Sequence, residues 1–310
     1  MIVDPCEALA EGKQLEFKGT VIKQPDPSSA ITIQDAMAKS TDFFGAYTGN
    51  PPPVCKSGIP LVDDTLRGLM PGSLSVLAAR TKVGKTSLTV WFATNAAING
   101  EMVGTVHLED EIEIIGTKML SMLANVEELK IQNGTLNDIE KQKIKETERA
   151  SGRLKIRTAK VSGFTATHVE QYVRDLANQG CRTVFVDYLH CITPSAEAAG
   201  NETTAIGLAL DRLHTVAIET NVAIILLAQL NRPKMVWSRE QGGYVPDESI
   251  PSVHDIRGSA MIANKARLAL IAYKHHDRIC VRVALSSRGG CEGRTMEFER
   301  DRKGILRMCK

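Results

Sequence analysis

The turn that contains Gly84, Lys85 and Thr86 has the residue types needed to hold a nucleoside triphosphate. A phosphate chain requires backbone N–H groups at a helix N-terminus, a lysine for the β- and γ-phosphate oxygens and a hydroxyl for Mg²⁺. Ala79 stands where the general phosphate-loop pattern has its first glycine, so an ordinary strand–loop–helix turn is the alternative. We expect ATP or another nucleoside triphosphate to contact Arg80, Gly84, Lys85, Thr86 and Ser87.

Two carboxylates that end apolar segments could complete a hydrolytic site. Asp187 follows the apolar run 183–186, and an acid at the end of such a strand normally supports the metal of a phosphate-binding loop. Thr86 and Asp187 are therefore the predicted Mg²⁺ residues. Glu109 ends the apolar segment 103–108 and could align or deprotonate the attacking water. An acidic helix start is an equally good interpretation of Glu109, because two further acids follow it.

Strands and helices must position these side chains, and the sequence alternates between the two. Short apolar runs and amphipathic segments follow one another from residue 57, as in βαβ units around a parallel sheet. After residue 265, strands follow without helices, which predicts an antiparallel extension of the same sheet. An α/β domain is therefore expected over residues 57–310. The predicted strands lie near 74–79, 102–107, 154–158, 182–187, 222–228, 267–273, 280–286, 295–299 and 305–308, and the predicted helices near 85–99, 111–124, 136–150, 167–179 and 205–219.

Residues 1–56 are predicted to form a separate N-terminal extension. Two loop-like stretches there flank one segment, at about 32–47, that has helical periodicity. Thr32 is its expected N-cap, and apolar residues from Ile33 to Tyr47 form one stripe. A helix this short must bury its stripe on another surface.

The composition of the 310 residues indicates one sizeable core, because 43% are hydrophobic and 24% charged. A formal net charge of +2 excludes a globally basic surface, so contact with nucleic acid would need a local patch. The seven cysteines lack metal-site spacing and are predicted to be reduced thiols. No secretory signal opens the chain and no apolar stretch could cross a bilayer, so we expect a soluble protein of the cytoplasm or an organelle matrix, without a membrane partner.

A long stretch without clear periodicity lies between Gln229 and Asp255. Long loops inside α/β domains are usually functional or disordered. Basic residues interleaved with an aromatic one are what a single-stranded nucleic acid requires, although a solvated mobile loop explains the same composition. The candidate DNA-binding residues are Arg232, Lys234, Trp237 and Arg239.

Taken together, residues 57–308 resemble the DnaB-type replicative helicases and the helicase half of phage-type and mitochondrial primase-helicases. In those families the phosphate loop begins with residues similar to Ala78-Ala79-Arg80 of this chain. Several separate motifs occur in the family's order, which is more specific than any one of them. They are Ser57-Gly58-Ile59-Pro60, the phosphate loop, Leu108-Glu109, Asp187-Tyr188-Leu189, Ala228-Gln229-Leu230-Asn231-Arg232 and Asp255-Ile256-Arg257-Gly258-Ser259.

The resemblance implies a RecA-like P-loop ATPase core and adds roles for particular residues. Glu109 corresponds to the catalytic base, and Gln229 to the glutamine that senses the γ-phosphate and connects it to the DNA-binding loop. Arg288 corresponds to an arginine offered to the nucleotide of the neighbouring subunit, and a solvated hairpin arginine is the alternative. Ser286 replaces the lysine that the family carries two residues earlier, which puts the rate of hydrolysis in doubt.

By the same resemblance the chain is expected to form a homo-hexameric ring and to unwind DNA by moving along a single strand. The helix at 32–47 would then dock on the adjacent subunit, unless it packs on its own domain. A primase, a polymerase or a loader are possible partners, and no priming activity is expected from this chain. The alternatives are a RecA-like recombinase or strand-annealing ATPase, and an ATP-binding regulator or loader that does not translocate.

Overall fold

The computed structural model describes residues 32–43, 54–161, 165–187, 189, 202–233, 235–238, 243–246 and 249–309. The chain divides into two units, Met1–Pro52 and Pro53–Lys310. In the first unit, helix α2 spans Ile33–Phe43. The backbone N–H of Asp35 donates to Thr32 Oγ1 at 3.1 Å, which confirms Thr32 as the N-cap. Residues 44–47 of the predicted helix lie outside the described residues.

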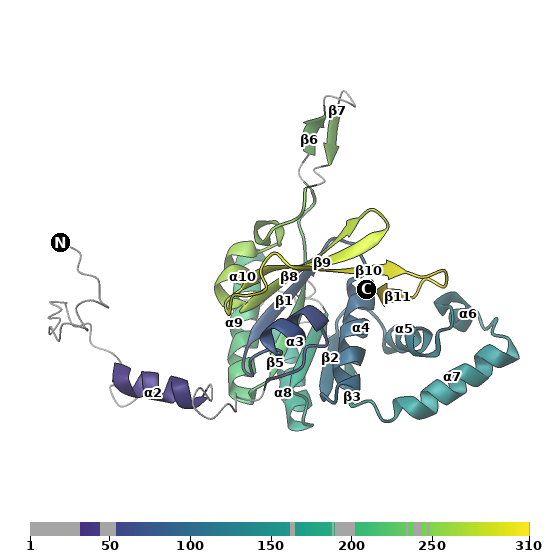
Figure 1. Ribbon diagram of the computed structural model, residues 1–310, viewed down its shortest axis with the longest axis horizontal. Coiled ribbons are helices and arrows are strands. Elements are labelled where there is room, and N and C mark those ends of the chain that lie inside the picture. Colours follow the sequence, from purple (N-terminus) through teal and green to yellow (C-terminus); the bar gives the residue numbers. More distant parts are fainter. Residues whose placement is uncertain are drawn as a thin grey trace. The chain divides into compact units, whose positions relative to one another are not determined.

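The second unit is built on a nine-stranded sheet with the order β11-β10-β9-β8-β1-β5-β4-β2-β3 (Figure 1). The six strands from β8 to β3 run parallel, and β9, β10 and β11 continue the sheet in antiparallel fashion. The strands are β1 (Leu74–Ala79), β2 (Val103–His107), β3 (Ile156–Lys160), β4 (Thr183–Asp187), β5 (Ala223–Gln229), β8 (Leu268–His275), β9 (Arg278–Ser286), β10 (Thr295–Arg300) and β11 (Leu306–Met308).

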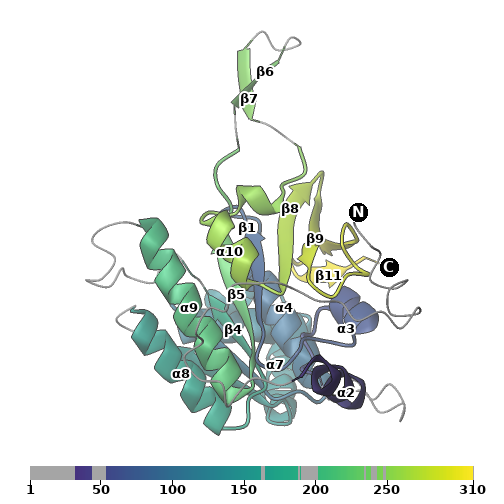
Figure 2. The same cartoon turned by 90° about the vertical axis from the view of Figure 1, so that its left-hand side faces the viewer.

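Helices cover both faces of the sheet, and α8 and α9 lie side by side on one of them (Figure 2). Residues of alternating orientation along each central strand therefore meet two different apolar clusters, and the strands are apolar throughout. On β1, Val76 joins the cluster with Val173 of α8, whereas Leu77 joins the one with Phe92 of α4. The helices of this unit are α3 (Pro60–Leu66), α4 (Lys85–Ile98), α5 (Ile112–Ala124), α6 (Glu128–Gln132), α7 (Asp138–Ser151), α8 (Ala166–Asn178), α9 (Glu202–Thr220) and α10 (Ser259–Lys265), with a 3₁₀ turn at Val253–Asp255.

The predicted fold class and its main strands and helices are confirmed, with three corrections. The antiparallel extension starts at β9 and not at the first strand after residue 265, because β8 pairs in parallel with β1. Helices α3, α6 and α10 were not predicted, since five to seven residues are too few to show a helical period. The stretch 230–255, expected to be irregular, contains the hairpin of β6 (Met235–Ser238) and β7 (Gly243–Pro246).

The parallel strands bring their carboxyl ends to one edge of the sheet, here called the C-edge. The C-edge is formed by the ends of β1, β2, β4, β5 and β8, and ligands of open α/β sheets bind at such edges. The hairpin β6–β7 follows β5 and projects beyond the same edge (Figure 1). Because β9 runs in the opposite direction, its end lies at the opposite edge, here called the N-edge.

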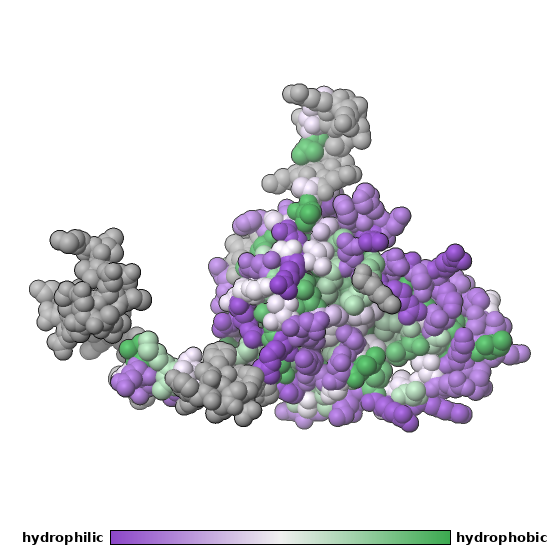
Figure 3. Space-filling model, in the orientation of Figure 1, coloured by the Kyte–Doolittle hydropathy of each residue, from purple (hydrophilic) through white to green (hydrophobic). Residues whose placement is uncertain are grey.

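The surface of the second unit is largely hydrophilic on the face drawn in Figure 3, and its exposed hydrophobic residues are scattered there. Among the helices that the structure describes, none has the length and apolarity to cross a membrane. Every described cysteine is a free thiol, and Cys55, Cys181, Cys280 and Cys291 are buried.

Candidate active site

The phosphate-loop candidate is a sharp turn between β1 and α4. Gly84 is the N-cap of α4 and has φ +108°, a conformation that an L side chain rarely adopts. The first-turn N–H groups of a helix have no intrahelical acceptor, so those of Lys85, Thr86 and Ser87 can bind an anion. Lys82 also has a positive φ of 65°, which makes it one of the few non-glycine residues in this region of the backbone map. The turn therefore has the geometry of an anion-binding loop.

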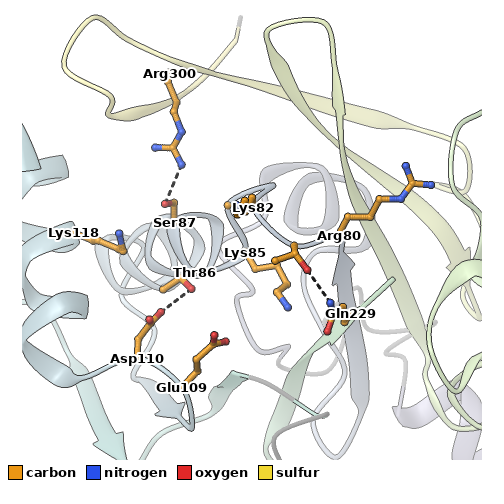
Figure 4. Close-up of a pocket in the computed structure, with 12 residues that line it drawn as sticks. Arg80, Lys82, Lys85, Thr86, Ser87, Glu109, Asp110, Lys118, Gln229 and Arg300 are labelled. Carbon is orange, nitrogen blue, oxygen red and sulfur yellow. Dashed lines mark hydrogen bonds between the residues drawn. The ribbon is translucent and has the colours of Figure 1, made fainter. Parts of the chain in front are cut away.

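A cavity of about 470 Å³ lies over this turn (Figure 4). It brings together residues from the turns after β1 and β2 and from α4, α5, β5 and β10, which are far apart in the sequence. The five residues predicted to contact the nucleotide line it, as do the predicted Glu109 and Gln229, whereas the sixth predicted cofactor residue, Asp187, is not part of the lining. Its lining consists of Arg80, Thr81, Lys82, Gly84, Lys85, Thr86, Ser87, Glu109, Asp110, Lys118, Gln229 and Arg300.

The hydroxyl of Thr86 sits between two carboxylates. Thr86 Oγ1 lies 3.0 Å from Asp110 Oδ2 and 3.4 Å from Asp187 Oδ2. Oxygen atoms of this kind suit Mg²⁺, which usually takes one or two carboxylates and completes its shell with water and phosphate. In the described residues, no group of three His, Cys, Asp or Glu side chains could hold a metal ion by itself. Phosphate oxygens of a bound nucleotide would therefore have to complete the coordination of Mg²⁺. Asp110 joins the predicted pair, and sequence reasoning had treated it only as part of a helix start.

Asp187 is 4% exposed at the end of β4. Burial raises the pKa of its carboxyl to about 6, while the Lys85 ammonium opposes this rise. The negative charges of Asp110 and Glu109 add to the rise. An Asp187 anion is thus held at a cost in folding free energy, which a bound cation would offset.

His107 pairs with Asp187 in the register of β2 and β4 and is 1% exposed. Both ring nitrogens lack a hydrogen-bond partner among the described residues. Burial lowers the pKa of this imidazole to about 4, so the ring is neutral near pH 7. His107 therefore adds no positive charge beside the carboxylates. The positive charge that lowers the pKa of Asp187 is that of Lys85.

Glu109 extends into the cavity from the end of β2, and its carboxylate points towards the region of Lys85 (Figure 4). The backbone around it is fixed by Lys160, whose Nζ donates to the carbonyl of Glu109 at 2.8 Å and pairs with Glu111 at 3.0 Å. Within the described residues, the Glu109 carboxylate itself forms no hydrogen bond or ion pair. It is therefore an available base on a fixed support, as the sequence suggested.

Gln229 ends β5 and donates from Nε2 to Thr81 Oγ1 at 2.8 Å. The two chain segments that lead to the β6–β7 hairpin are joined immediately beside it. Leu230 and Ile256 form an isolated bridge, and the N–H of Arg257 donates to the Gln229 carbonyl at 3.0 Å. A displacement of Gln229 would therefore move both stems of the hairpin.

Arg288 is the one predicted catalytic residue that lies outside the cavity. It follows β9 at the N-edge, where its Nη1 donates to the carbonyls of Leu66 at 2.9 Å and Gly68 at 3.2 Å. The Ser286 N–H in the same turn donates to Glu292 at 2.6 Å. Because the sheet separates the two edges, this guanidinium cannot serve the phosphate loop of its own chain.

Besides Lys82 in the turn itself, two basic residues that line the cavity were missed from the sequence. Arg300 ends β10 at the C-edge, donating to Ser87 Oγ at 3.3 Å and to the Gly304 carbonyl at 2.7 Å. Lys118 on α5 is paired with Glu128 at 2.9 Å. The sequence indicated the strand near 295–299 but carried no signal for the edge at which Arg300 would lie.

The candidate DNA-binding residues fall in and beside the hairpin. Arg232 is exposed, and Trp237 on β6 is 59% exposed next to Met235 and Val236, which are also exposed. Lys234 and Arg239 lie outside the described residues.

The comparisons with known proteins agree with this geometry. Residues 55–306 match the family described as DnaB-like helicase C terminal domain. The replicative DNA helicase DnaB of Haemophilus influenzae is 28% identical over 286 residues, which cover 88% of this chain and 57% of that protein. The replicative DNA helicase DnaB of Buchnera aphidicola subsp. Schizaphis graminum is 30% identical over 67% of this chain and 43% of its own length.

Solved structures show the same fold. One that is described as an ATPase domain superposes with a TM-score of 0.74 at 20% identity, covering 90% of this chain and 99% of that domain. A DnaB-like replicative helicase, described with its interactions with primase, gives a TM-score of 0.73 at 18% identity and covers 97% of this chain and 71% of that one. The chain spans about half the length of the curated relatives it matches. Since the match extends over residues 55–306, the chain belongs to the DnaB-like helicase C-terminal domain family.

Proposed function

We propose that this chain is an ATP-hydrolysing motor that assembles into a ring, moves along single-stranded DNA and unwinds duplex DNA. The observation that carries the proposal is the split between the two edges of the sheet. The C-edge holds Lys85, Thr86 and Glu109 in one cavity, whereas Arg288 lies at the N-edge. A complete site would then require two chains.

In the proposed site the turn and its flanking residues hold the triphosphate. Lys85 and the N–H groups of the first turn of α4 bind the phosphates, and Arg300 reaches Ser87 from above (Figure 4). Thr86 and Asp187, with Asp110 nearby, would hold Mg²⁺. When bound, Mg²⁺ neutralises negative charge on the β- and γ-phosphate oxygens.

Hydrolysis in this site would use Glu109 as the base that orients or deprotonates the attacking water. Lys85 stabilises the negative charge that develops on the transferred phosphoryl group. Arg288 of a neighbouring copy would add a second positive charge to the same group, which is the usual use of an arginine supplied by another subunit. In the free chain Arg288 is already held in place by the carbonyls at the end of α3, so its position is preorganised.

The hairpin is the proposed link to DNA. Gln229 would exchange its bond to Thr81 for one to the γ-phosphate, and its backbone is tied to the base of β6–β7. Arg232 would contact phosphates and Trp237 would stack on a base, which are the two contacts that single strands provide. A primase is described as the partner of one solved relative, and such a contact is a proposal for this chain as well.

Replacing Lys85 with alanine tests the nucleotide site. We expect ATP turnover to fall by roughly two to three orders of magnitude, the usual loss when a charge-stabilising group is removed. Lys145→Ala, which removes an exposed lysine on α7, is the matched control and should retain turnover. Survival of turnover in the Lys85→Ala protein would show that the cavity is not the site of hydrolysis.

A forked DNA substrate and electron micrographs with nucleotide and Mg²⁺ test the mechanical part of the proposal. Rings and catalytic strand displacement are the expected results. Filaments without strand displacement would point to a recombinase or annealing ATPase instead. Nucleotide binding without DNA-stimulated turnover would point to a regulator, which the Ser286 substitution would favour.

A further inference from the structure

A second cavity, of about 630 Å³, also borders the phosphate-loop turn. It is formed by the turn itself, the end of β8 with the turn that follows, and residues after the β6–β7 hairpin. Arg80, Thr81 and Lys82 line both cavities, so a ligand in either one touches the same turn. The remaining lining residues are Val83, Ser249, Pro251, Tyr273, Lys274, His275 and His276.

The described lining of this second cavity carries positive charge and no negative charge. Arg80, Lys82 and Lys274 line it, and no carboxylate belongs to its described lining. None of these three cations forms an ion pair with another described residue. In addition, Arg80 Nε is buried without a hydrogen-bond partner in the described part of the chain, and its side chain extends away from Lys85 (Figure 4). Such a cluster of cations is relieved by a bound anion.

Flat rings accompany the cations. Tyr273, His275 and His276 line the cavity, and the two histidine rings lie 4.4 Å apart between centroids. Cationic groups beside stacking surfaces are the combination that binds a nucleotide unit, with its phosphate on the charges and its base on the rings. The volume is also within the range of pockets that bind small ligands.

The position of the second cavity favours a strand of nucleic acid over a free nucleotide. Ser249 and Pro251 follow the hairpin by a few residues, so the cavity lies at the base of the element proposed to contact DNA. Free ATP normally brings Mg²⁺, which needs acidic ligands, and the described lining offers none. Backbone phosphates of a strand need only positive charge.

We infer that the second cavity binds one nucleotide unit of single-stranded nucleic acid, with its phosphate between Lys82 and Lys274 and its base against the histidine rings. The inference rests on the proposed function and extends it, because it places a binding site for the strand on the phosphate-loop turn itself. A strand bound at this site would restrain Thr81, the residue that Gln229 contacts.

The double variant Lys274→Ala/His276→Asn tests the inference, since both residues are exposed and asparagine tolerates the positive φ of 52° at position 276, so folding should be unaffected. The measurement is fluorescence anisotropy of a labelled oligothymidylate across a salt series, with ADP and Mg²⁺ present. We expect affinity to fall roughly fivefold or more and the salt slope to decrease by about one unit, as for one lost phosphate contact. The control Lys145→Ala removes a charge from the distant helix α7 and should change neither quantity.

A labelled ADP analogue, titrated in parallel, separates the two sources of phosphate. Loss of ADP affinity with unchanged oligothymidylate affinity would overturn the inference in favour of a free nucleotide, and no change in either would overturn it outright. Cross-linking from bromodeoxyuridine-substituted DNA to residues 273–276 is the expected independent result. Its absence would equally contradict binding of DNA in the second cavity. Failure here with Lys85→Ala still abolishing turnover would leave the proposed motor intact.

Discussion

The two edges of the sheet contrast in what they can do alone. The C-edge gathers a phosphate-binding turn, the carboxylates of Glu109 and Asp110 after β2, that of Asp187 at the end of β4, and Gln229 at the end of β5. The N-edge presents Arg288, held by two backbone carbonyls at the end of α3. In the proposed ring, a site divided in this way would keep hydrolysis low in a single chain and make it depend on assembly.

The largest effect should come from substitutions that inactivate the N-edge in one chain and the C-edge in another. Arg288→Ala should lower ATP turnover by about three orders of magnitude, which is the scale for an arginine supplied to a phosphoryl group. Mixing Arg288→Ala with Lys85→Ala chains should restore part of the turnover, because one interface in the mixture has both an intact cavity and an intact arginine. The measurement is steady-state phosphate release.

Arg294→Ala is the matched control, since Arg294 is an exposed arginine beside the same β9–β10 turn. It should retain turnover in the unmixed protein. Two inactive chains that stay inactive together would mean that Arg288 does not complete its neighbour's site.

An intermediate effect is expected at Asp187 of the C-edge, where one substitution should lower activity and raise stability. Asp187→Asn should abolish Mg²⁺-dependent turnover while raising the free energy of unfolding by about 1–3 kcal/mol at pH 7.5. The folded-state pKa of Asp187 is raised to about 6 from 3.8, so its ionised form costs stability above pH 6 and this cost disappears as the pH falls towards 4. Urea unfolding in EDTA at pH 7.5 and pH 4.5 measures the difference.

Asp301→Asn is the control with the opposite sign. Burial by itself raises the pKa of Asp301, but the hydrogen bonds that its carboxylate accepts from the Ile305 and Lys303 N–H groups and from Arg307 together lower it. Its replacement should destabilise the fold at pH 7.5. If Asp187→Asn proved equally destabilising, the carboxylate would be a structural group and not a strained site for a cation.

The smallest effect should appear at the hairpin, which belongs to the C-edge but lies outside the cavity. Trp237→Ala should weaken binding of single-stranded DNA by about 1–3 kcal/mol, the value of one base stacked on an aromatic ring. Val236→Ala on the same strand is the control and should bind normally. Anisotropy titrations distinguish the two, and equal affinity for both variants would remove Trp237 from the proposed interface.

Much of the site followed from local sequence, because its parts are local. Gly84, Lys85 and Thr86 occupy one turn, and Glu109 and Asp187 each follow a short apolar run, so a strand end could be predicted for both. The contact of Asp110 with Thr86 was missed, since it depends on how the start of α5 sits over α4. The β6–β7 hairpin was missed because four-residue strands without alternating polarity give no clear period.

The sequence by itself determined the order of strands and helices and the chemical groups at their ends, since apolar runs and helical periods are set by neighbouring residues. Only the tertiary structure decided which edge each group occupies. Arg288 lies in the turn between β9 and β10 and Arg300 ends β10, 12 residues later, so the length of β10 separates Arg300 at the cavity from Arg288 at the N-edge. The direction of β8, from which that of β9 and β10 follows, depends on its pairing with the distant strand β1, and no local pattern encodes that pairing.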